Sequence, residues 1–348
     1  MLKTQSWKKT EYTKRQINVA GDIIRNPNSS IEEIDFATKV IDNWRAAHAY
    51  PLHVFYIHLR RMASHRKDIL VVERLKRLDS IVGKLKREQG MDLWRMQDLG
   101  GCRFVVPSVE DVYNFSTKYQ KSQIRHEFKR AYDYIANPKP SGYRSLHLVY
   151  KYHSDTKETY NNNMLIELQF RTHLQHIWAT ALETMGIFTK QALKAGQGEE
   201  YIKRFFVVVS SLFAIKEGYP IVPGTINDEK ELITEVEYLN TQYHLLDMLS
   251  AIQVFMNRER EIESLSKKDG YYLLILNYNT RMLSIKYFQP SQIEEANEAY
   301  MLIEKKREES NVDAVLVRAE SFKELKAAYP NYFADISEFV SLVRAYLV

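Results

Sequence analysis

Residues 136–151 limit the possible folds most, because they join a rigid turn directly to a strand pattern. Two prolines fix the backbone φ angle, and the Ser-Gly pair after them supplies a turn that ends any regular element. From 146 to 151, apolar and polar side chains alternate, which predicts a half-buried strand. The sequence therefore predicts a rigid loop that presents Tyr143 and Arg144 at the entry of a strand, with Lys139 alongside.

Two interpretations of Tyr143 are open at this point. An exposed aromatic ring flanked by cations suits a nucleic-acid base that stacks on the ring while the cations hold its phosphates. A loop tyrosine whose ring simply caps the edge of the sheet explains the same residues equally well.

Length and composition indicate a globular protein. The 348 residues suffice for about two or three domains with a sizeable core. No apolar run approaches membrane-spanning length and the N-terminus lacks a signal-peptide core, so we expect a cytoplasmic protein with no membrane partner. The single cysteine, Cys102, excludes an intramolecular disulfide and a thiolate zinc cluster. The net charge of +5 permits an anionic partner without requiring one.

Residues 60–88 are more basic than the chain as a whole, with ten Lys or Arg against four Asp or Glu. Four of its side chains have the spacing of a single helical face: Lys76, Ser80, Lys84 and Arg87. A solvated charged face is the usual explanation of such a pattern. A row of cations that includes a hydroxyl also fits a bound triphosphate, which needs several donors at once.

Two acidic residues are candidate metal ligands. Asp98 stands just ahead of a predicted strand, a common position for a magnesium ligand and also for a turn or cap aspartate. In the strand pattern of residues 164–171, Glu167 shares the polar face with Gln169 and Arg171. Glu167 becomes a ligand candidate only if the fold brings it close to Asp98.

Helices are predicted in both halves of the chain, and the second half changes in character because a hinge, a long helix and a small mixed unit follow there. Helices are predicted at residues 31–44, 51–62, 108–121, 172–190 and 200–216, then a hinge at 220–224 and one long helix over 228–266. A hairpin (271–278 and 282–288), a helix (291–309) and a strand (312–318) form a small β-β-α-β unit, before closing helices at 321–329 and 334–347. His173 and His176 have no third nitrogen or sulfur ligand in the sequence, so they indicate a structural or substrate-facing role rather than zinc.

Four segments together resemble the synthetase domain of the RelA/SpoT family of ATP pyrophosphokinases. They are RLKRLDSIVGKLKR, RMQDLGGCRFVV, PSGYRSLH and IELQFRTHLQHIWATALE, within about residues 70–190 and in the order and spacing of that family. The resemblance implies an α+β fold with a mixed, mostly antiparallel, nucleotidyltransferase-like sheet flanked by helices. The chain lacks the His-Asp pair that marks the family's hydrolase domain, so we expect a synthetase without the reverse activity.

The resemblance also implies roles for particular residues, with ATP as the pyrophosphate donor and Mg²⁺ as the cofactor. ATP would be held by Arg74, Lys76, Ser80, Lys84, Arg87 and Arg103. Asp98 and Glu167 would bind Mg²⁺, and Glu167 would also activate the attacking hydroxyl as a base. The base of the acceptor would stack on Tyr143. The residues near the acceptor would be Lys139, Tyr143, Arg144, His147, Gln169 and Arg171.

The acceptor differs between branches of the family. Members that make alarmones transfer pyrophosphate to GDP or GTP, whereas the toxic small alarmone synthetases modify the 3′ CCA end of tRNA and stop translation. The C-terminal unit, with Tyr329 and Tyr332 as a YxxY pair and no zinc ligand set, resembles the pseudo-zinc-finger antitoxin of CapRel-type fused toxin–antitoxin proteins. In those proteins the YxxY segment blocks the ATP site until a phage protein, typically the major capsid protein, binds the antitoxin domain.

The leading hypothesis is therefore an autoinhibited, monomeric anti-phage toxin that modifies tRNA. The alternative of the same class is a (p)ppGpp synthetase that uses GDP or GTP. A non-catalytic RNA-binding module is a third hypothesis, against which the presence of both Asp98 and Glu167 argues. The implied domains are a toxin synthetase domain (1–225), a connecting long helix (226–268), an antitoxin domain (269–330) and a closing anchor helix (331–348).

Overall fold

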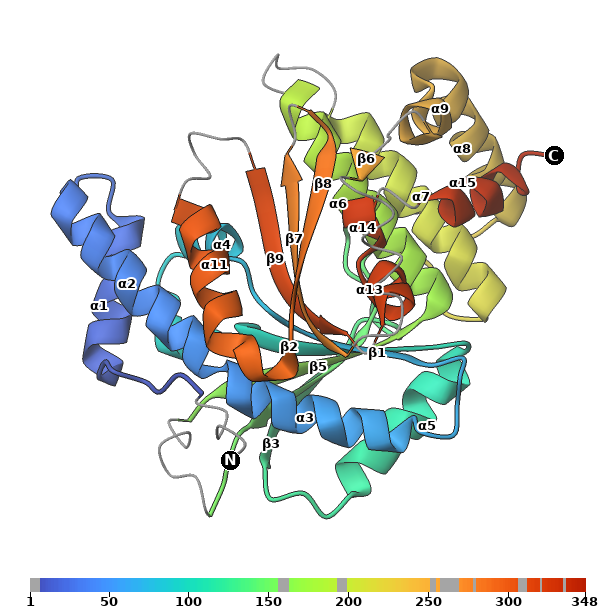
Figure 1. Ribbon diagram of the computed structural model, residues 1–348. Coiled ribbons are helices and arrows are strands. Elements are labelled where there is room, and N and C mark those ends of the chain that lie inside the picture. The colour runs from blue at the N-terminus through green and yellow to red at the C-terminus, as the bar shows by residue number, and fades with distance from the viewer. Residues whose placement is uncertain are drawn as a thin grey trace.

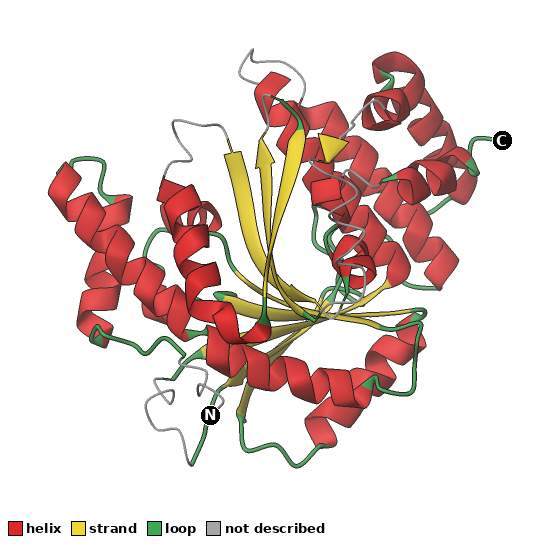
Figure 2. Ribbon diagram, viewed as in Figure 1, coloured by secondary structure: helices red, strands yellow, loops and turns green. Residues whose placement is uncertain are grey.

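A single sheet forms the centre of the computed structural model, which describes residues 7–155, 163–192, 199–250, 255–256, 269–277, 280–305, 312–319, 321–333 and 336–348. The sheet has nine strands in the order β3-β4-β5-β2-β1-β9-β7-β8-β6. It twists strongly, so that β7, β8 and β9 stand across the strands of the N-terminal half (Figure 1). Helices pack around the sheet (Figure 2). The expected α+β class is confirmed.

The N-terminal half contributes five neighbouring strands. These are β1 (Leu70–Leu75), β2 (Gly100–Val106), β3 (Glu127–Asp133), β4 (Leu146–Lys151) and β5 (Leu165–Thr172). β2 and β5 run parallel, whereas the β1–β2, β3–β4 and β4–β5 pairs are antiparallel. The expectation of a mixed, mostly antiparallel sheet is confirmed here.

Alternation of side chains gives this part of the sheet an apolar and a polar face. The apolar face, with Leu168 near its centre, is buried against α3 (Ala49–Met62) and α5 (Val109–Lys121). The polar face carries Glu167, as the sequence pattern predicts, and the helix that follows β5, α6 (His173–Ala192), packs on that side. The chemistry-bearing side chains therefore lie on the face that α3 and α5 leave uncovered.

The other N-terminal helices follow the predicted signals. The capping box forms at α2 (Ile31–Ala47): Ser30 Oγ accepts from the Glu33 amide at 3.2 Å, and the Glu33 carboxylate accepts from the Ser30 amide at 2.8 Å. α1 (Lys14–Arg25) packs on α2 and on α4 (Leu78–Arg87) through a shared apolar cluster. A short 3-10 turn, η1 (Leu93–Arg95), leads toward β2.

The predicted β-β-α-β unit is present, but its strands belong to the same sheet. It consists of β7 (Gly270–Asn277), β8 (Met282–Phe288), a 3-10 turn η4 (Pro290–Gln292), α11 (Ile293–Lys305) and β9 (Val312–Ala319). β9 pairs with β7 on one side and with β1 on the other, where Glu73 lies opposite Arg318. The unit therefore extends the N-terminal sheet, and the expected domain boundaries stay a prediction.

Three short helices close the chain on the polar side of the sheet. They are α13 (Phe322–Ala328), α14 (Pro330–Phe333) and α15 (Ser337–Arg344). α13 packs against β1 and β9, and α15 packs against α6. The closing segment formed by these helices therefore begins over the polar face, where α13 and α14 lie, and ends with α15 against α6 and α9 (Figure 1).

The prediction of one long helix over residues 228–266 is wrong. α7 (Glu199–Glu217) is followed by the predicted hinge segment and then by α8 (Glu229–Tyr243), which ends because His244 adopts a left-handed conformation with φ of 50°. A separate helix, α9 (Leu245–Ser250), begins at once, and the Asn240 side chain accepts from the amide of Leu246 at 2.9 Å. Phe255–Met256 then forms the short strand β6, parallel to β8. Residues 251–254 and 257–268 lie outside the described residues.

Smaller differences affect the basic segment. Lys76 lies between β1 and α4, so it does not share the helical face of Lys84 as predicted. Gly100 and Gly101 are the first two paired residues of β2. β1 and β3 themselves were not foreseen from the sequence.

No helix in the described part of the chain combines the length and the apolar character needed to span a membrane.

The hinge prediction for residues 220–224 falls on a segment that is hydrogen-bonded to its neighbours: the Val222 amide donates to Ser211 Oγ at 3.1 Å. Whether the segment moves stays a prediction.

Candidate active site

A small polar cavity of about 40 Å³ lies on the polar face, under the closing segment. Its lining brings together residues from β1, β2, β5, the approach to β2 and the C-terminal end of α13. The polar side chains among them are Arg74, Lys76, Asp98, Arg103, Glu167, Gln169 and Tyr329. Residues far apart in sequence, and most of the predicted ATP and metal ligands, therefore converge.

The register of the strands explains this convergence. Arg74 lies opposite Gly101, and Gly101 lies opposite Glu167, so these residues form one row across β1, β2 and β5. Because the middle residue of the row has no side chain, Arg74 and Glu167 face each other over an open space. The next row places Arg103 beside Gln169, which in turn lies opposite His147 of β4.

Asp98 is held between two lysines. Lys76 Nζ donates to Asp98 Oδ2 at 2.7 Å, and Lys84 Nζ donates to Oδ1 at 3.1 Å. Burial raises the pKa of the Asp98 carboxyl, but the two ammonium charges outweigh it and lower the pKa to about 2. Burial in turn lowers the pKa of Lys76. Asp98 is therefore ionised at neutral pH, with two cations that can also contact a phosphate.

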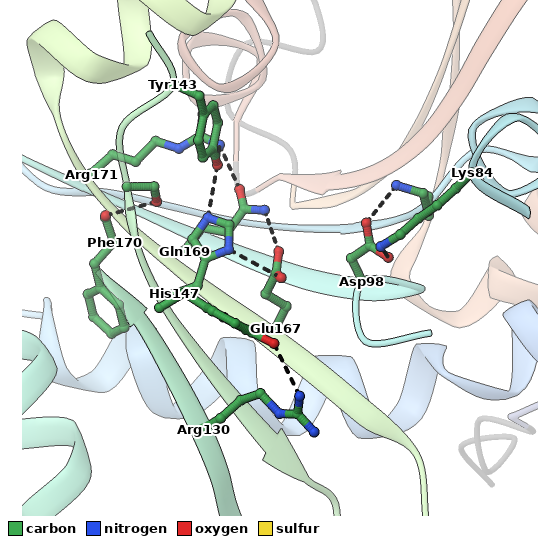
Figure 3. A network of polar contacts seen from close by, with 12 residues as sticks. Lys84, Asp98, Arg130, Tyr143, His147, Glu167, Gln169, Phe170 and Arg171 are labelled. Atoms are coloured by element: carbon green, nitrogen blue, oxygen red, sulfur yellow. Dashed lines mark hydrogen bonds and ion pairs between the residues drawn. The ribbon is translucent and has the colours of Figure 1, made fainter. Parts of the chain in front are cut away.

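Glu167 is oriented by two neighbours on the sheet. His147 Nδ1 lies 3.2 Å from Glu167 Oε2, and Gln169 Nε2 donates to Oε1 at 2.7 Å (Figure 3). Burial raises the pKa of the Glu167 carboxyl, but His147 and the Gln169 amide lower it further, so the net shift is downward. Both carboxylate oxygens are thus fixed, and the group is available as an anion.

Tyr143 is joined to the same network. Arg171 Nη2 donates to the Tyr143 hydroxyl at 2.6 Å and to Gln169 Oε1 at 2.9 Å, and the hydroxyl lies 2.9 Å from His147 Nε2. The donors therefore follow one another from Arg171 through Tyr143 and His147 toward Glu167 (Figure 3). A half-buried Tyr143 ring, with Lys139 Nζ at 5.3 Å and Arg171 Cζ at 5.0 Å from its centre, can serve as a stacking surface.

The predicted rigid loop has a structural cause. Gly142 has a φ of 86°, which favours glycine, and its amide donates to the Lys139 carbonyl at 2.8 Å. A Cβ atom at this position would lie 2.9 Å from the Trp178 ring. Glycine is therefore required both by the turn and by the close approach of α6, and this fixes Tyr143 at the start of β4.

Arg103 and Arg171 carry features of an anion site. Each has a buried Nε donor with no partner among the described residues. Burial, with the like charges of Arg171 and Arg74, lowers the pKa of Arg103 to about 10. Such a concentration of buried cations is stabilised when an anion enters.

Glu183 of α6 was missed by the sequence interpretation. Burial raises the pKa of its carboxyl, but Arg74 and Arg103 lower it further, which places this acid among the cations of the site. Its position on a helix, 16 residues after Glu167, gave no local signal of that role.

The two C-terminal tyrosines, Tyr329 and Tyr332, lie beside the basic side chains of the site. Tyr329 is buried, lines the cavity and donates its hydroxyl to the Glu73 carbonyl at 3.2 Å. Tyr332 donates to Asp313 Oδ2 at 3.0 Å and accepts from Arg77 Nη1 at 3.2 Å. Arg103 Nη1 also donates to the Ala328 carbonyl at 3.3 Å, so the closing segment contacts a predicted ATP ligand directly.

Arg144, Ser80 and Arg87 are among the predicted residues that do not line the cavity. Arg144 is buried on the far side of its loop, where it donates to the Ile135 carbonyl at 3.2 Å and the Pro220 carbonyl at 2.6 Å. Its placement indicates a structural role instead of the expected contact with the acceptor. Ser80 is half-buried on α4, and Arg87 is exposed at the end of that helix.

The residues present fit a magnesium ion that shares its ligands with a substrate. Asp98 and Glu167 line the same cavity, so one ion in that cavity can lie near both carboxylates. Mg²⁺ is commonly held by one or two carboxylates plus phosphate oxygens. No group of three or more His, Cys, Asp or Glu forms in the described residues, so such an ion would need phosphate ligands.

The two histidines of α6 make other contacts. His173 Nε2 lies 2.8 Å from Glu338 Oε1, and His176 Nε2 lies 3.2 Å from the Ala327 carbonyl. Both therefore join α6 to the closing segment.

Residues 73–191 match the model of the region found in RelA/SpoT proteins. Two curated proteins of Bacillus subtilis are similar: GTP pyrophosphokinase YwaC, 30% identical over 131 residues, and GTP pyrophosphokinase YjbM, 34% identical over 119 residues. The alignments cover 36% and 33% of this chain and 58% and 55% of those proteins. The chain thus spans little more than half the length of the curated relatives it matches.

Solved structures show a similar pattern. Small alarmone synthetase 1 from Bacillus subtilis, bound to its product pppGpp, is 24% identical with a TM-score of 0.42 and covers 50% of this chain and 91% of that chain. A GTP pyrophosphokinase family protein from Streptococcus pneumoniae is 24% identical with a TM-score of 0.41. That match covers 54% of this chain and 91% of the Streptococcus pneumoniae chain. The matched RelA/SpoT region contains the cavity residues from Arg74 to Gln169, whereas the β-β-α-β unit and the closing segment lie outside it.

Proposed function

We propose that the RelA/SpoT region of this chain is an ATP pyrophosphokinase, which transfers the β,γ-pyrophosphate of ATP to a ribose hydroxyl. The observation that carries this proposal is the cavity, in which two carboxylates face a group of buried cations. The curated relatives are named GTP pyrophosphokinases, which supports the same reaction class.

The cations of the cavity suit the phosphates of ATP. The cavity is lined by Arg74, Lys76 and Arg103. The buried Nε of Arg103, which has no partner among the described residues, can donate to a phosphate oxygen. Lys84 reaches the same space through Asp98. Ser80 and Arg87 would take part only at the outer end of the nucleotide, since neither lines the cavity. Dispersed phosphate charge needs several such donors at once.

Glu167 is placed to take the proton of the acceptor hydroxyl. The hydroxyl oxygen forms a bond to the β-phosphorus, the bond from that phosphorus to the α,β-bridging oxygen breaks, and AMP leaves. Glu167 accepts the proton, while His147 and Gln169 keep both of its oxygens in position. Mg²⁺ bound at Asp98 and Glu167 would neutralise charge on the phosphates.

For the acceptor we propose the 3′ CCA end of tRNA, with its terminal base on the Tyr143 ring. The cations on both sides of that ring, Lys139 and Arg171, support an anionic, base-containing acceptor. The names of the curated relatives favour a guanine nucleotide instead, which makes GDP or GTP the second candidate.

We further propose that the closing segment keeps the enzyme inactive. A cavity of about 40 Å³, with Tyr329 in its lining, is far smaller than the roughly 300–1,000 Å³ of ordinary ligand sites, and in this proposal the Tyr329 ring takes up space that ATP needs. ATP can therefore enter only after Tyr329 leaves. Such a device needs two states separated by a few kcal/mol, so that a partner can shift the population.

The partner in this proposal is a phage protein, such as the major capsid protein, which binds the β-β-α-β unit of a monomer and releases an anti-phage toxin. Hydrogen exchange tests this directly. Faster exchange around residues 329–332 on adding capsid protein is the expected result, and unchanged exchange there contradicts the release.

The proposed reaction is tested with ATP labelled at the γ-phosphate, offered together with bulk tRNA and GTP. The enzyme is a Tyr329→Ala/Tyr332→Ala variant. Matched controls are Tyr329→Phe, which keeps the ring and should stay closed, and the double variant with Glu167→Gln added. Label on tRNA that depends on Glu167 supports the toxin. Label on the guanine nucleotide alone supports an alarmone synthetase, and no label on either acceptor contradicts the proposed reaction.

A further inference from the structure

The polar face of the sheet continues beyond the cavity to its edge strand, β3. Four residues there, which we call the edge strip, combine two cations with two aromatic rings: Arg130, Tyr132, Tyr134 and Lys139. The first three alternate along the chain and so share one side of β3 and its extension. The Tyr134 amide continues the pairing by donating to the Ser145 carbonyl at 3.0 Å.

The register connects the edge strip to the catalytic residues. Arg130 lies opposite Val149, and Val149 lies opposite Glu167. In the next row, Tyr132 lies opposite His147, and His147 lies opposite Gln169. Two strand spacings, about 10 Å in all, therefore separate the strip from the proposed catalytic base on the same face.

The two rings of the strip lie parallel to each other, and one of them meets the Tyr143 ring edge to face. The Tyr132 and Tyr134 rings are parallel, with an angle of 4° and 5.8 Å between their centres. The Tyr134 ring lies 6.1 Å from the Tyr143 ring at an angle of 68°. The surface on which an acceptor base would stack thus extends by two further rings toward the sheet edge.

The cations of the strip accompany the rings. Lys139 Nζ lies 4.3 Å from the centre of the Tyr134 ring, and Arg130 Nη1 donates to the Tyr132 hydroxyl at 3.2 Å (Figure 3). Arg130 and Lys139 are exposed, and both rings are half-buried. Each cation therefore lies next to a tyrosine ring, and its charge is accessible to an anion from solvent.

We propose that the edge strip binds the nucleotides next to the reacting one in a single-stranded RNA 3′ end, with their bases on Tyr134 and Tyr132 and their phosphates on Lys139 and Arg130. Aromatic faces interleaved with cations are the arrangement that holds single strands without reading their sequence. A mononucleotide acceptor would occupy Tyr143 and Lys139 and leave Arg130, Tyr132 and Tyr134 unused. This inference rests on the proposed function and names the substrate class of the same site.

The test measures binding to the full-length chain by fluorescence anisotropy. The probes are an eight-nucleotide single-stranded RNA that ends in CCA, the same RNA with abasic residues at its last three positions, and GTP. The variants are Tyr132→Ala, its control Tyr132→Phe, and Arg130→Gln.

Tyr132→Ala should raise the Kd for the RNA about tenfold, because stacking on one ring is lost, and should leave the Kd for GTP within about twofold. Tyr132→Phe keeps the ring and should bind the RNA like the wild type. The abasic RNA loses stacking on three rings and should bind the wild type at least about a hundredfold more weakly. Arg130→Gln should reduce the slope of log Kd against log salt by about 0.7, the contribution of one phosphate contact on a single strand.

An unchanged Kd for the RNA in Tyr132→Ala overturns the inference, as does equal loss of RNA and GTP binding in that variant. Equal affinity for the intact and abasic RNA also overturns it, because the rings would then contribute nothing. The transfer assay separates this outcome from failure of the proposed function. If the Tyr132→Ala variant still transfers label to tRNA with an unchanged KM for tRNA, binding at the edge strip is refuted but the proposed reaction is not. If no acceptor is labelled, the proposed reaction is refuted.

Discussion

At the scale of single residues, Asp98 shows how the closed site balances its charges. The carboxylate is the shared counter-ion of Lys76 and Lys84, at 2.7 and 3.1 Å. The side chain is only 22% exposed, so the pairing is weakly screened. The folded protein therefore depends on this acid being ionised.

The first prediction concerns the pH dependence of stability. The folded-state pKa of Asp98 is lowered from 3.8 to about 2, so its contribution to stability is fully present above about pH 4 and is lost as the pH falls toward 2. Asp98→Asn removes this contribution, about 2 kcal/mol of unfolding free energy. Urea unfolding at several pH values should show the two proteins converging between pH 4 and 2. A constant difference across that range would contradict the assignment.

The second prediction concerns Arg144, which the sequence placed beside the acceptor. In the structure it is buried and donates to two backbone carbonyls and to Ser210 Oγ at 3.2 Å. Arg144→Ala should lower the free energy of unfolding by about 3 kcal/mol, since charged hydrogen bonds are lost and buried carbonyls lose their donors. Arg130→Ala, at an exposed position, is the matched control and should change stability by less than about 0.5 kcal/mol. Equal stability of the two variants would refute the structural role.

Sequence patterns predicted the polar face of β5 because strand alternation is a local property. The polar face with Glu167, Gln169 and Arg171 follows from the period of two alone. The neighbours of that face do not, because the register that sets Gly101 between Arg74 and Glu167 is a long-range property. Arg144 was misplaced for a similar reason: its partners in α7 and the following loop are remote in sequence.

At the scale of elements, β1 and β3 escaped prediction because charge conceals their pattern. β1, with the sequence LVVERL, lies inside the basic segment. One of its two neighbouring strands, β9, belongs to the C-terminal unit and is remote in sequence. β3 is an edge strand that is mostly exposed, so it has little apolar alternation to recognise. Many strands and helices with a buried face were predicted, for example α2, α5, β5 and β9, but the break between α8 and α9 was not.

The third prediction concerns the break that ends α8. His244 is exposed and has a φ of 50°, a conformation that costs an L-residue about 1 kcal/mol or more. His244→Gly should therefore raise the free energy of unfolding by about 1 kcal/mol. His244→Ala keeps the strain and should give no gain. A stabilising alanine in chemical denaturation would mean that the chain prefers a continuous helix there.

At the scale of the whole molecule, the C-terminal unit is attached at more than one place. Besides the β1–β9 pairing and Tyr329, a buried ion pair joins Arg45 of α2 to Glu304 of α11 at 3.0 Å. Glu304 also accepts from the Leu78 amide, at the start of α4, at 3.3 Å. Release of the closing segment is therefore opposed by contacts at the opposite side of the unit.

The fourth prediction tests that attachment. Glu304→Ala leaves Arg45 buried with Asp42 as its remaining acidic partner, so the free energy of unfolding should fall by about 3 kcal/mol. Hydrogen exchange should accelerate in α11 and β9. Glu298→Ala removes the same charge from an exposed position of α11 and serves as the control. Equal exchange in both variants would show that the ion pair does not hold the unit.

The most direct test of the proposed chemistry compares two labels. The Tyr329→Ala/Tyr332→Ala variant is given acceptor with ATP labelled at either the α- or the γ-phosphate, and the products are separated by chromatography. Transfer of pyrophosphate predicts labelled acceptor from γ-labelled ATP only, with labelled AMP from α-labelled ATP, and neither product when Glu167→Gln is added. Labelled acceptor from α-labelled ATP, with release of pyrophosphate, would mean that the site transfers a nucleotidyl group and would contradict the account.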